Sequence, residues 1–294
     1  MRKYVLIIFA LIPLMSNAFY AIVDGIYYDL DSEKKEATVI SGIDYTTYMG
    51  NIVIPSSIEH EGIEYSVTAI GSSAFDDSFG LTKITIPESV TKIGLSAFGN
   101  TVNLNRVTYL GSMESWCKIS FAGDRSNGFL WLSLENNPLF CCGGEEIKDI
   151  LNIPETVKTI NPYSFCYLYV KQINLYDVEI IGKWAFMDCK KLKDVYCYSP
   201  FVPQCDNTAF NNKIIMTATL HVPEESLELY KSDSSWKNFG SIVPIDNTNI
   251  YNIERNEVKA IGIYSVEGRL INSEKKGINI IRMSDGTIKK VIIK

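Results

Sequence analysis

A short phrase that recurs along the chain constrains its fold more than any other feature. The phrase reads V-T-K-I-G-L-S-A-F at residues 90–98, and copies stand at 67–75, 157–165 and 178–186. Its last three positions return once more as Thr208-Ala209-Phe210. The phenylalanines that end neighbouring copies lie 21 to 24 residues apart. A period of roughly 20–29 residues with regular apolar positions is typical of a leucine-rich repeat solenoid.

Each repeat also contains a short strand. Ile84 and Ile86 alternate with Thr85, which is the period of a half-buried strand, and Pro87 ends it. The recurring phrase forms the other side of each coil, where the chain returns toward the next strand; we call it the returning side. There the Val, Ile and Phe of the phrase should point inward, and Gly94 should allow a tight bend. Comparable strands are expected at 107–109, 151–153, 173–175, 195–197, 220–222 and 242–244. We expect these strands to stack into one parallel sheet along one side of the solenoid.

The N-terminus has the pattern of a secretory signal peptide over residues 1–18. Arg2-Lys3 is a basic start, an apolar run follows, and Ser16-Asn17-Ala18 supplies small residues before a cleavage point. No later stretch is long and apolar enough to span a membrane. The sequence therefore predicts an exported, soluble mature chain without a transmembrane segment.

The remaining chain divides by pattern into three parts. Residues 19–64 lack the repeat and read as an N-terminal β-hairpin cap, which an open solenoid end requires. The solenoid is predicted over 65–246, with an insertion at 111–146 and a C-terminal cap at 201–246. Residues 250–294 change to plain β alternation and predict a small all-β tail.

The insertion leaves two interpretations open. It is either two degenerate coils or a folded excursion from one side, and Ser112 could cap a short helix in it. The run Phe129-Leu130-Trp131 would be the core of an extra coil or an exposed apolar patch.

Seven cysteines is an odd number, so at least one is free or pairs with another chain. Cys166 and Cys189 stand next to the repeat phenylalanines, where a small buried side chain is needed. Cys117 could pair with Cys141 or Cys142 in an oxidising compartment, whereas a bridge between those two neighbours would be strained.

The composition argues against several functions. A net charge of -6 provides no basic excess for nucleic acid, and two histidines leave little scope for a histidine-based metal site. The usual motifs of hydrolases, metalloproteases and phosphate loops do not occur. We therefore expect no enzyme activity, no catalytic residue, no cofactor and no metal.

Alternation along the strands identifies candidate partner-binding residues. Side chains that flank the inward apolar positions should face outward and form a polar ladder over the sheet. The ladder comprises Lys83, Thr85, Arg106, Thr108, Asn152, Gln172, Asn174, Asp194, Tyr196, Thr219 and His221. Charge reversal at Lys83 and Arg106 is predicted to weaken partner binding without lowering the melting temperature.

The phrase V-x-x-I-G-x-x-A-F, with I-x-I-P-x-x-V between copies, resembles the BspA-like leucine-rich repeat proteins of bacterial surfaces. The resemblance implies a right-handed solenoid with short parallel strands and 3₁₀ or helical turns. It also implies binding or adhesion at the cell surface, to a protein or glycan of a host or neighbouring cell. The tail reads I-Y-S-V-E-G-R at residues 263–269 and K-G-I-N-I-I-R-M-S-D-G at 276–286. In these segments it resembles the C-terminal sorting domains of the Bacteroidetes type IX secretion route, although it is short.

The leading hypothesis is thus a secreted or surface-displayed, non-catalytic binding protein. Two alternatives are a secreted hydrolase or inhibitor on the same scaffold, and an envelope spacer without a ligand.

Overall fold

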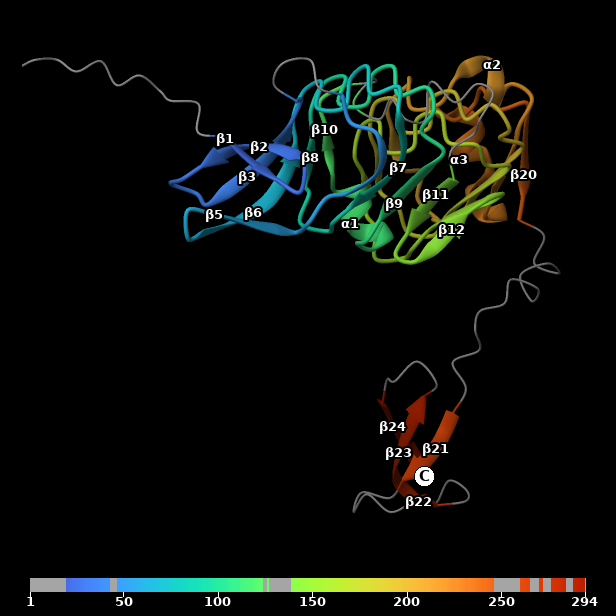
Figure 1. The fold of residues 1–294 in the computed structure, drawn as a ribbon. Coiled ribbons are helices and arrows are strands. Elements are labelled where there is room, and N and C mark those ends of the chain that lie inside the picture. The colour runs from blue at the N-terminus through green and yellow to red at the C-terminus, as the bar shows by residue number, and fades with distance from the viewer. Residues whose placement is uncertain are drawn as a thin grey trace, which may run out of the picture. The chain divides into compact units, whose positions relative to one another are not determined.

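The computed structural model describes residues 20–42, 47–123, 126, 139–245, 260–264, 270–271, 276–283 and 288–293. The chain forms two compact units, Met1–Ile245 and Asp246–Lys294. Figure 1 labels the elements of both units. The predicted signal peptide and the run Phe129-Leu130-Trp131 lie outside the described residues.

The first unit is the predicted leucine-rich repeat solenoid, and its first parallel sheet takes one strand from each successive coil. The strands are β4 (Gly50–Val53), β7 (Leu81–Ile86), β9 (Arg106–Tyr109) and β11 (Leu139–Cys142). Inward residues meet in register, as Ile84 of β7 does with Val107 of β9. β12 (Glu145–Ile147) then folds back antiparallel on β11 and ends the sheet. Because β4 belongs to this sheet, the coils begin upstream of the predicted start at Tyr65.

A second parallel sheet carries the later coils. Its strands are β13 (Ile150–Ile153), β15 (Gln172–Leu175), β17 (Asp194–Cys197), β19 (Thr219–Val222) and β20 (Ser241–Pro244). All neighbouring pairs are parallel, and β13 is an edge strand. The prediction of one continuous sheet was therefore wrong. The physical reason is that the β11–β12 hairpin uses the edge to which β13 would have added.

The returning side of the coils forms two narrow ladders. One contains β6 (Ile63–Ile70), β8 (Lys92–Ile93) and β10 (Ser120–Phe121), and the other contains β14 (Thr159–Ile160), β16 (Ile180–Ile181) and β18 (Gln204–Cys205). The ladders part at the same level as the sheets. Asn161 joins them, since its backbone N–H donates to the carbonyl of Cys117 at 3.0 Å and its Nδ2 to that of Lys118 at 2.9 Å.

The insertion supplies a coil of its own. β10 continues the returning ladder and β11 continues the first sheet. Before β10, and after β9, lies α1 (Met113–Cys117), whose N-cap is the predicted Ser112, with Oγ accepting from the Ser115 N–H at 3.1 Å. The described part of the insertion is thus integrated into the solenoid.

The N-terminal segment covers the first coil with antiparallel strands. β1 (Tyr20–Val23), β2 (Ile26–Asp31) and β3 (Glu36–Ile40) form a meander, and β3 pairs in parallel with β6. β5 (Ser57–His60) pairs antiparallel with β6. Alternate residues of β3, Ala37 and Val39, are fully buried.

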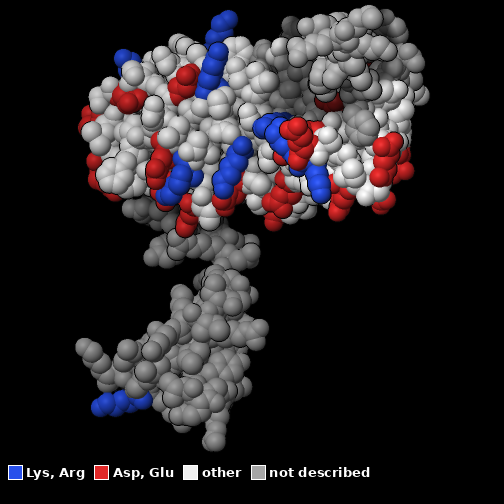
Figure 2. Space-filling model, turned by 90° about the vertical axis from the view of Figure 1, so that its left-hand side faces the viewer, with Lys and Arg blue, Asp and Glu red and all other residues white. Residues whose placement is uncertain are grey.

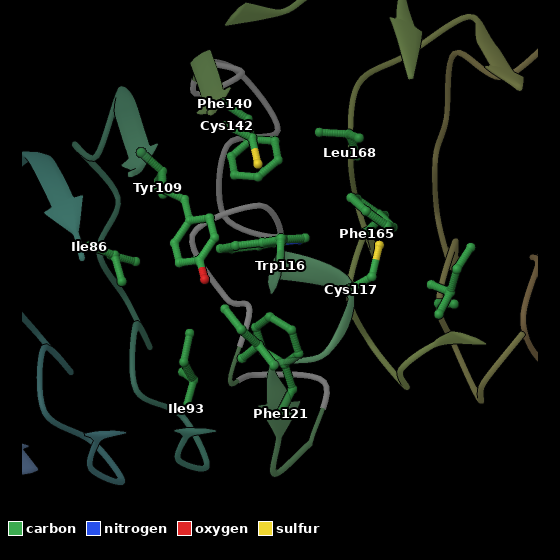
Figure 3. Packing of buried hydrophobic residues seen from close by; sticks show 14 of the residues in the cluster. Ile86, Ile93, Tyr109, Trp116, Cys117, Phe121, Phe140, Cys142, Phe165 and Leu168 are labelled. Carbon is green, nitrogen blue, oxygen red and sulfur yellow. The ribbon is translucent and has the colours of Figure 1, made fainter. Parts of the chain in front are cut away.

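Stacked aromatic rings run along the interior of the solenoid. Phe75 and Phe98 stack at 5.2 Å, and Phe165 and Phe186 stack at 5.6 Å, with interplanar angles of 7° and 8°. At the level where the two sheets part, the interior is filled by Trp116 instead of a repeat phenylalanine. Figure 3 shows it among Tyr109, Phe121, Phe140 and Phe165, and its ring centroid lies 4.7 Å from that of Phe140. A larger ring therefore fills the irregular coil.

The tight turns of the phrase use left-handed backbone at residues other than glycine. Ser73, Ser96, Tyr163 and Trp184, each two residues before a repeat phenylalanine, have φ of 53° to 67°. A turn follows Gly94, as predicted, but Gly94 itself does not have positive φ. A Cβ on Gly94 would lie 2.3 Å from the Ser72 nitrogen of the preceding coil. Glycine is needed there because two backbones approach closely.

The C-terminal end of the first unit is sealed by short helices. α2 (Asn212–Ile215), η3 (Glu224–Ser226) and α3 (Leu227–Ser232) lie around β19. Tyr230 and Trp236 are completely buried and Phe239 is 6% exposed. Phe210, the last repeat phenylalanine, contacts both Trp236 and Phe239.

The second unit is a four-stranded antiparallel sheet. Its strands are β21 (Ala260–Tyr264), β22 (Leu270–Ile271), β23 (Gly277–Met283) and β24 (Ile288–Ile293), in the order β22-β21-β23-β24. Among the residues described in either unit, we find no helix with the length and apolarity of a membrane span.

None of the seven cysteines, all of which the structure describes, is in a disulfide. The bridge considered between Cys117 and Cys141 or Cys142 is therefore not formed. Cys166 and Cys189 are completely buried, in agreement with the predicted packing role. Burial raises the pKa of Cys189 to about 12.

Candidate interaction surface

The eleven predicted residues lie on two separate sheet faces. Lys83, Thr85, Arg106 and Thr108 belong to β7 and β9 of the first sheet, where Lys83 is paired with Arg106 and Thr85 with Thr108. The other seven belong to the second sheet, and we call them the polar row. They are Asn152, Gln172, Asn174, Asp194, Tyr196, Thr219 and His221.

On the first sheet, Arg106 is already engaged by neighbouring side chains. Its Nη1 donates to the sulfur of Cys141 at 3.0 Å, and its Nη2 lies 3.8 Å from Glu146 Oε2. Lys83 beside it is exposed. Of the two cations that were expected to act together, Lys83 is therefore available to a partner, whereas Arg106 already contacts other side chains.

On the second sheet, three amide side chains form a hydrogen-bonded chain. Gln172 Nε2 donates to Asn174 Oδ1 at 2.8 Å, and Asn174 Nδ2 donates to Asn152 Oδ1 at 2.7 Å. Asn174 is only 4% exposed because its neighbours cover it. The prediction that Asn174 faces outward as an accessible residue is therefore corrected. Its amide orients the two outer amides.

A histidine, a tyrosine and a carboxylate form the other half of the polar row. The rings of His221 and Tyr196 are stacked at a centroid distance of 4.0 Å and an angle of 4°. His221 Nε2 is hydrogen-bonded to Asp194 Oδ1 at 2.9 Å. Tyr196 is paired with His221 across the strands, and Asp194 is paired with Thr219. The hydrogen bond between His221 and Asp194 therefore runs diagonally across the two strands.

The structure adds aromatic residues that alternation did not identify. Tyr176 and Tyr198 directly follow β15 and β17, and their rings stack at 4.9 Å and 5°. Tyr198 also lies 6.1 Å from Tyr196, so the rings continue the polar row. Burial, together with the neighbouring tyrosines, raises the pKa of Tyr198 to about 12, which keeps its hydroxyl protonated at neutral pH. Tyr176 and Tyr198 are one coil apart in the sequence, and this spacing is the feature from which sequence reasoning could have identified them.

Phe201 is a second residue that sequence reasoning did not single out. Phe201 is 79% exposed, although Ser199, two residues earlier in the chain, is buried. The Tyr230 hydroxyl donates to the carbonyls of Ser199 and Phe201 at 3.2 and 3.3 Å. The backbone that presents Phe201 is therefore held in place.

The chemistry of these faces is that of contact surfaces. Within the described ranges no group of three or more His, Cys, Asp or Glu side chains is arranged to hold a metal ion. Figure 2 shows basic and acidic side chains interspersed on the face in view, without a large area of one sign. The described constellation offers amides, phenols, one imidazole and one carboxylate for hydrogen bonding.

Short parallel strands at a period of one coil, with stacked phenylalanines inside, define a leucine-rich repeat scaffold. More particularly, the chain belongs to the family of the BspA type leucine rich repeat region. The family model matches six copies over residues 45–128 and 139–257. This match begins within the segment predicted as a cap, as β4 does.

The chain is also similar to solved structures of bacterial proteins. A leucine rich cell surface protein from Faecalibacterium prausnitzii is 16% identical over 80% of this chain and 97% of that chain, with a TM-score of 0.27. A leucine-rich repeat protein from Bacteroides ovatus is 15% identical over 76% of each chain, with a TM-score of 0.33. The leucine rich repeat protein of T. pallidum is 16% identical over 74% of this chain and 79% of that chain, with a TM-score of 0.31. The comparison with curated proteins gave no match.

Proposed function

We propose that this chain is an exported, non-catalytic interaction protein that binds a protein partner through the polar row of the second sheet. The observation that carries the proposal is the presence of two groups of mutually contacting side chains within the row. Three amides are linked by hydrogen bonds, and His221 is held by both Tyr196 and Asp194.

These contacts favour binding because they fix the side chains before a partner arrives. Immobilising a flexible side chain at an interface costs about 0.5–1.5 kcal/mol. Gln172 and His221 already make side-chain hydrogen bonds in the free protein, so less of this cost remains. Tyrosine is enriched in protein interfaces because it combines a large ring with a hydroxyl group.

The sheet face also has the right geometry for an extended partner. The strands of neighbouring coils are in register, so equivalent side chains repeat at the strand spacing of about 4.8 Å. Polar side chains at this repeat can meet successive residues of a second chain. Phe201, which follows β17 in the chain, would supply an exposed apolar anchor.

Export rests on the pattern of residues 1–18, and surface display rests on the tail. The basic start, apolar run and small residues support secretion. The segments 263–269 and 276–286 carry the resemblance to type IX sorting domains. We propose that the partner is a protein on a host or neighbouring cell.

A microarray of surface proteins and glycans tests this proposal. The probe is residues 19–294, labelled at one engineered terminal site, and the paired probe carries Asp194→Ala and His221→Ala. A third probe carries Glu179→Ala, an exposed residue of the returning side. Protein spots that bind the first and third probes and lose the second support the proposal.

Four other results would overturn it. Binding to glycan spots alone would assign a different partner class, and equal signals from all three probes would remove the polar row from the interface. Turnover of peptide or glycoside substrates by the purified chain would replace the binding role with the hydrolase alternative. Absence of any bound spot would favour the spacer.

A further inference from the structure

A pocket of about 410 Å³ lies at the level where the two parallel sheets part. Its lining comes from the β11–β12 hairpin, the link to β13, and the turns that precede β15 and β17. The pocket exists because β12 turns back on β11 instead of continuing into β13. Small-molecule sites commonly have volumes of about 300–1,000 Å³, so one small ligand fits.

The lining includes a group of apolar side chains. Leu168 is buried, Ile147 is half-buried, and Leu139 and Tyr169 are 37% and 41% exposed. No side-chain amide occurs among the lining residues that the structure describes, and the Tyr169 phenol is their one hydroxyl. These side chains suit an apolar body.

Charged side chains also line the pocket, with lysines in excess. Lys171 Nζ lies 3.0 Å from Asp149 Oδ1, and Lys148 Nζ lies 3.6 Å from Glu146 Oε1. Lys191 is the third lysine of the lining. Its Nζ lies 5.2 Å from the centroid of the Tyr169 ring, and none of the described carboxylates is within ion-pair distance of it.

Lys191 therefore has a different role from the other two lysines. Lys171 and Lys148 are neutralised by their carboxylates, whereas Lys191 retains its positive charge beside an aromatic ring. An anionic group in the pocket would make a charge-assisted contact with it, while an attached apolar body would cover Leu139, Leu168 and Tyr169.

We propose that this pocket is a second binding site, separate from the polar row, for a small carboxylic acid with an apolar body. The site takes the carboxylate at Lys191 and the apolar body against Tyr169 and the leucines. No catalytic step is involved.

The test compares four probes by titration calorimetry with residues 19–294. The probes are 3-phenylpropionate, its uncharged amide, 3-phenylpropylamine, and glucuronate, which has the carboxylate without the apolar body. We expect 3-phenylpropionate to bind roughly tenfold more tightly than the amide, the effect of one charge-assisted contact. The amine and glucuronate should bind more weakly still.

Matched variants locate the site. Lys191→Ala should remove the preference for the acid over the amide, and Tyr169→Ala should weaken both. Lys190→Ala removes the same charge from the neighbouring exposed residue, which does not line the pocket, and should bind as the unchanged protein does. Thermal melting checks that each variant is folded.

The proposal is overturned if the acid, amide and amine bind equally, if glucuronate matches the acid, or if none binds. It is also overturned if Lys190→Ala and Lys191→Ala have the same effect. The polar-row variant Asp194→Ala with His221→Ala should leave these affinities unchanged, so the two proposals fail independently.

Discussion

The indole Nε1 of Trp116 donates a hydrogen bond to the backbone carbonyl of Ser164 at 3.0 Å, 48 residues further along the chain. This contact joins coils on either side of the level where both strand ladders part. Trp116 is completely buried and packs on Tyr109, Phe121 and Phe140. It therefore holds together two halves that lack strand pairing at this level.

We predict that Trp116→Ala lowers the free energy of unfolding by about 3–5 kcal/mol. Trp116→Phe keeps much of the packing and should cost about 1–3 kcal/mol through the lost hydrogen bond and the smaller ring. Urea unfolding followed by circular dichroism measures both. Trp184→Phe is the control, because that ring is half-buried and should cost less than about 1 kcal/mol. Equal losses at the two tryptophans would contradict this role.

Gly94→Ala should destabilise the solenoid although a helix or strand would tolerate it. The new methyl group would meet the Ser72 nitrogen of the preceding coil at 2.3 Å, so the coils must separate. Overpacking of this kind costs about 1–3 kcal/mol or more. Thermal melting should show a clear loss for Gly94→Ala and little change for the exposed neighbour variant Leu95→Ala. An unchanged melting temperature in both would refute the close approach.

Two buried tyrosine hydroxyls should respond oppositely to removal. The hydroxyl of Tyr65 is buried without a hydrogen-bond partner among the described residues, so Tyr65→Phe should leave stability equal or slightly higher. The hydroxyl of Tyr230 donates to two carbonyls, so Tyr230→Phe should cost about 1–3 kcal/mol. Chemical unfolding of both variants measures the change in the free energy of unfolding. A larger loss of stability for Tyr65→Phe than for Tyr230→Phe would show that the Tyr65 hydroxyl has a hydrogen-bond partner in the folded protein.

Stability should fall as the pH rises above the ordinary thiol range. Burial raises the pKa of Cys142 and Cys189 to about 12 and that of Cys197 to about 11. Between the unfolded pKa near ~8.5 and these values, the unfolded state releases protons that the folded state retains. Each thiol therefore reduces stability by about 1.4 kcal/mol per pH unit in that window.

Unfolding midpoints measured in reducing buffer between neutral pH and mildly alkaline pH test this slope. Cys189→Ala should show a shallower decline than the unchanged chain, even though its stability at neutral pH is lower. A slope that is the same in both proteins would mean that the Cys189 thiol ionises freely when folded.

The sequence was informative where the structure depends on one coil at a time. The inward Val, Ile and Phe of residues 90–98 could be read from the repeat, and all three are buried as predicted. Trp236, which lies within the segment 201–246 predicted as a C-terminal cap, is completely buried. Such features need only the local pattern and the requirement that a solenoid end be covered.

The parting of the sheets could not be read in the same way. β11 has the sequence L-F-C-C, which lacks the alternating polar residues of the other strands. Whether β12 or β13 takes its free edge depends on competing pairings between distant segments, and periodicity carries no information on that choice. The same limit explains why β4 was assigned to the cap.

Alternation proposes which residues make up the candidate site, but it does not give the contacts between them. Alternation places Tyr196 and His221 on the outer face, yet their stacking and the bond to Asp194 depend on the register between coils. Asn174 shows the consequence, since an outward position became a buried link between two other amides.

The most direct test of the binding account compares two double variants against one partner taken from the protein array. Asp194→Ala with His221→Ala alters the second sheet, and Lys83→Glu with Arg106→Glu alters the first. Biolayer interferometry gives the affinities, and thermal melting confirms the fold. We predict a loss of at least about tenfold for the second-sheet variant, as expected for hot-spot residues, and a smaller loss for the first-sheet variant. Unchanged affinity of the second-sheet variant, with its melting temperature preserved, would contradict the account.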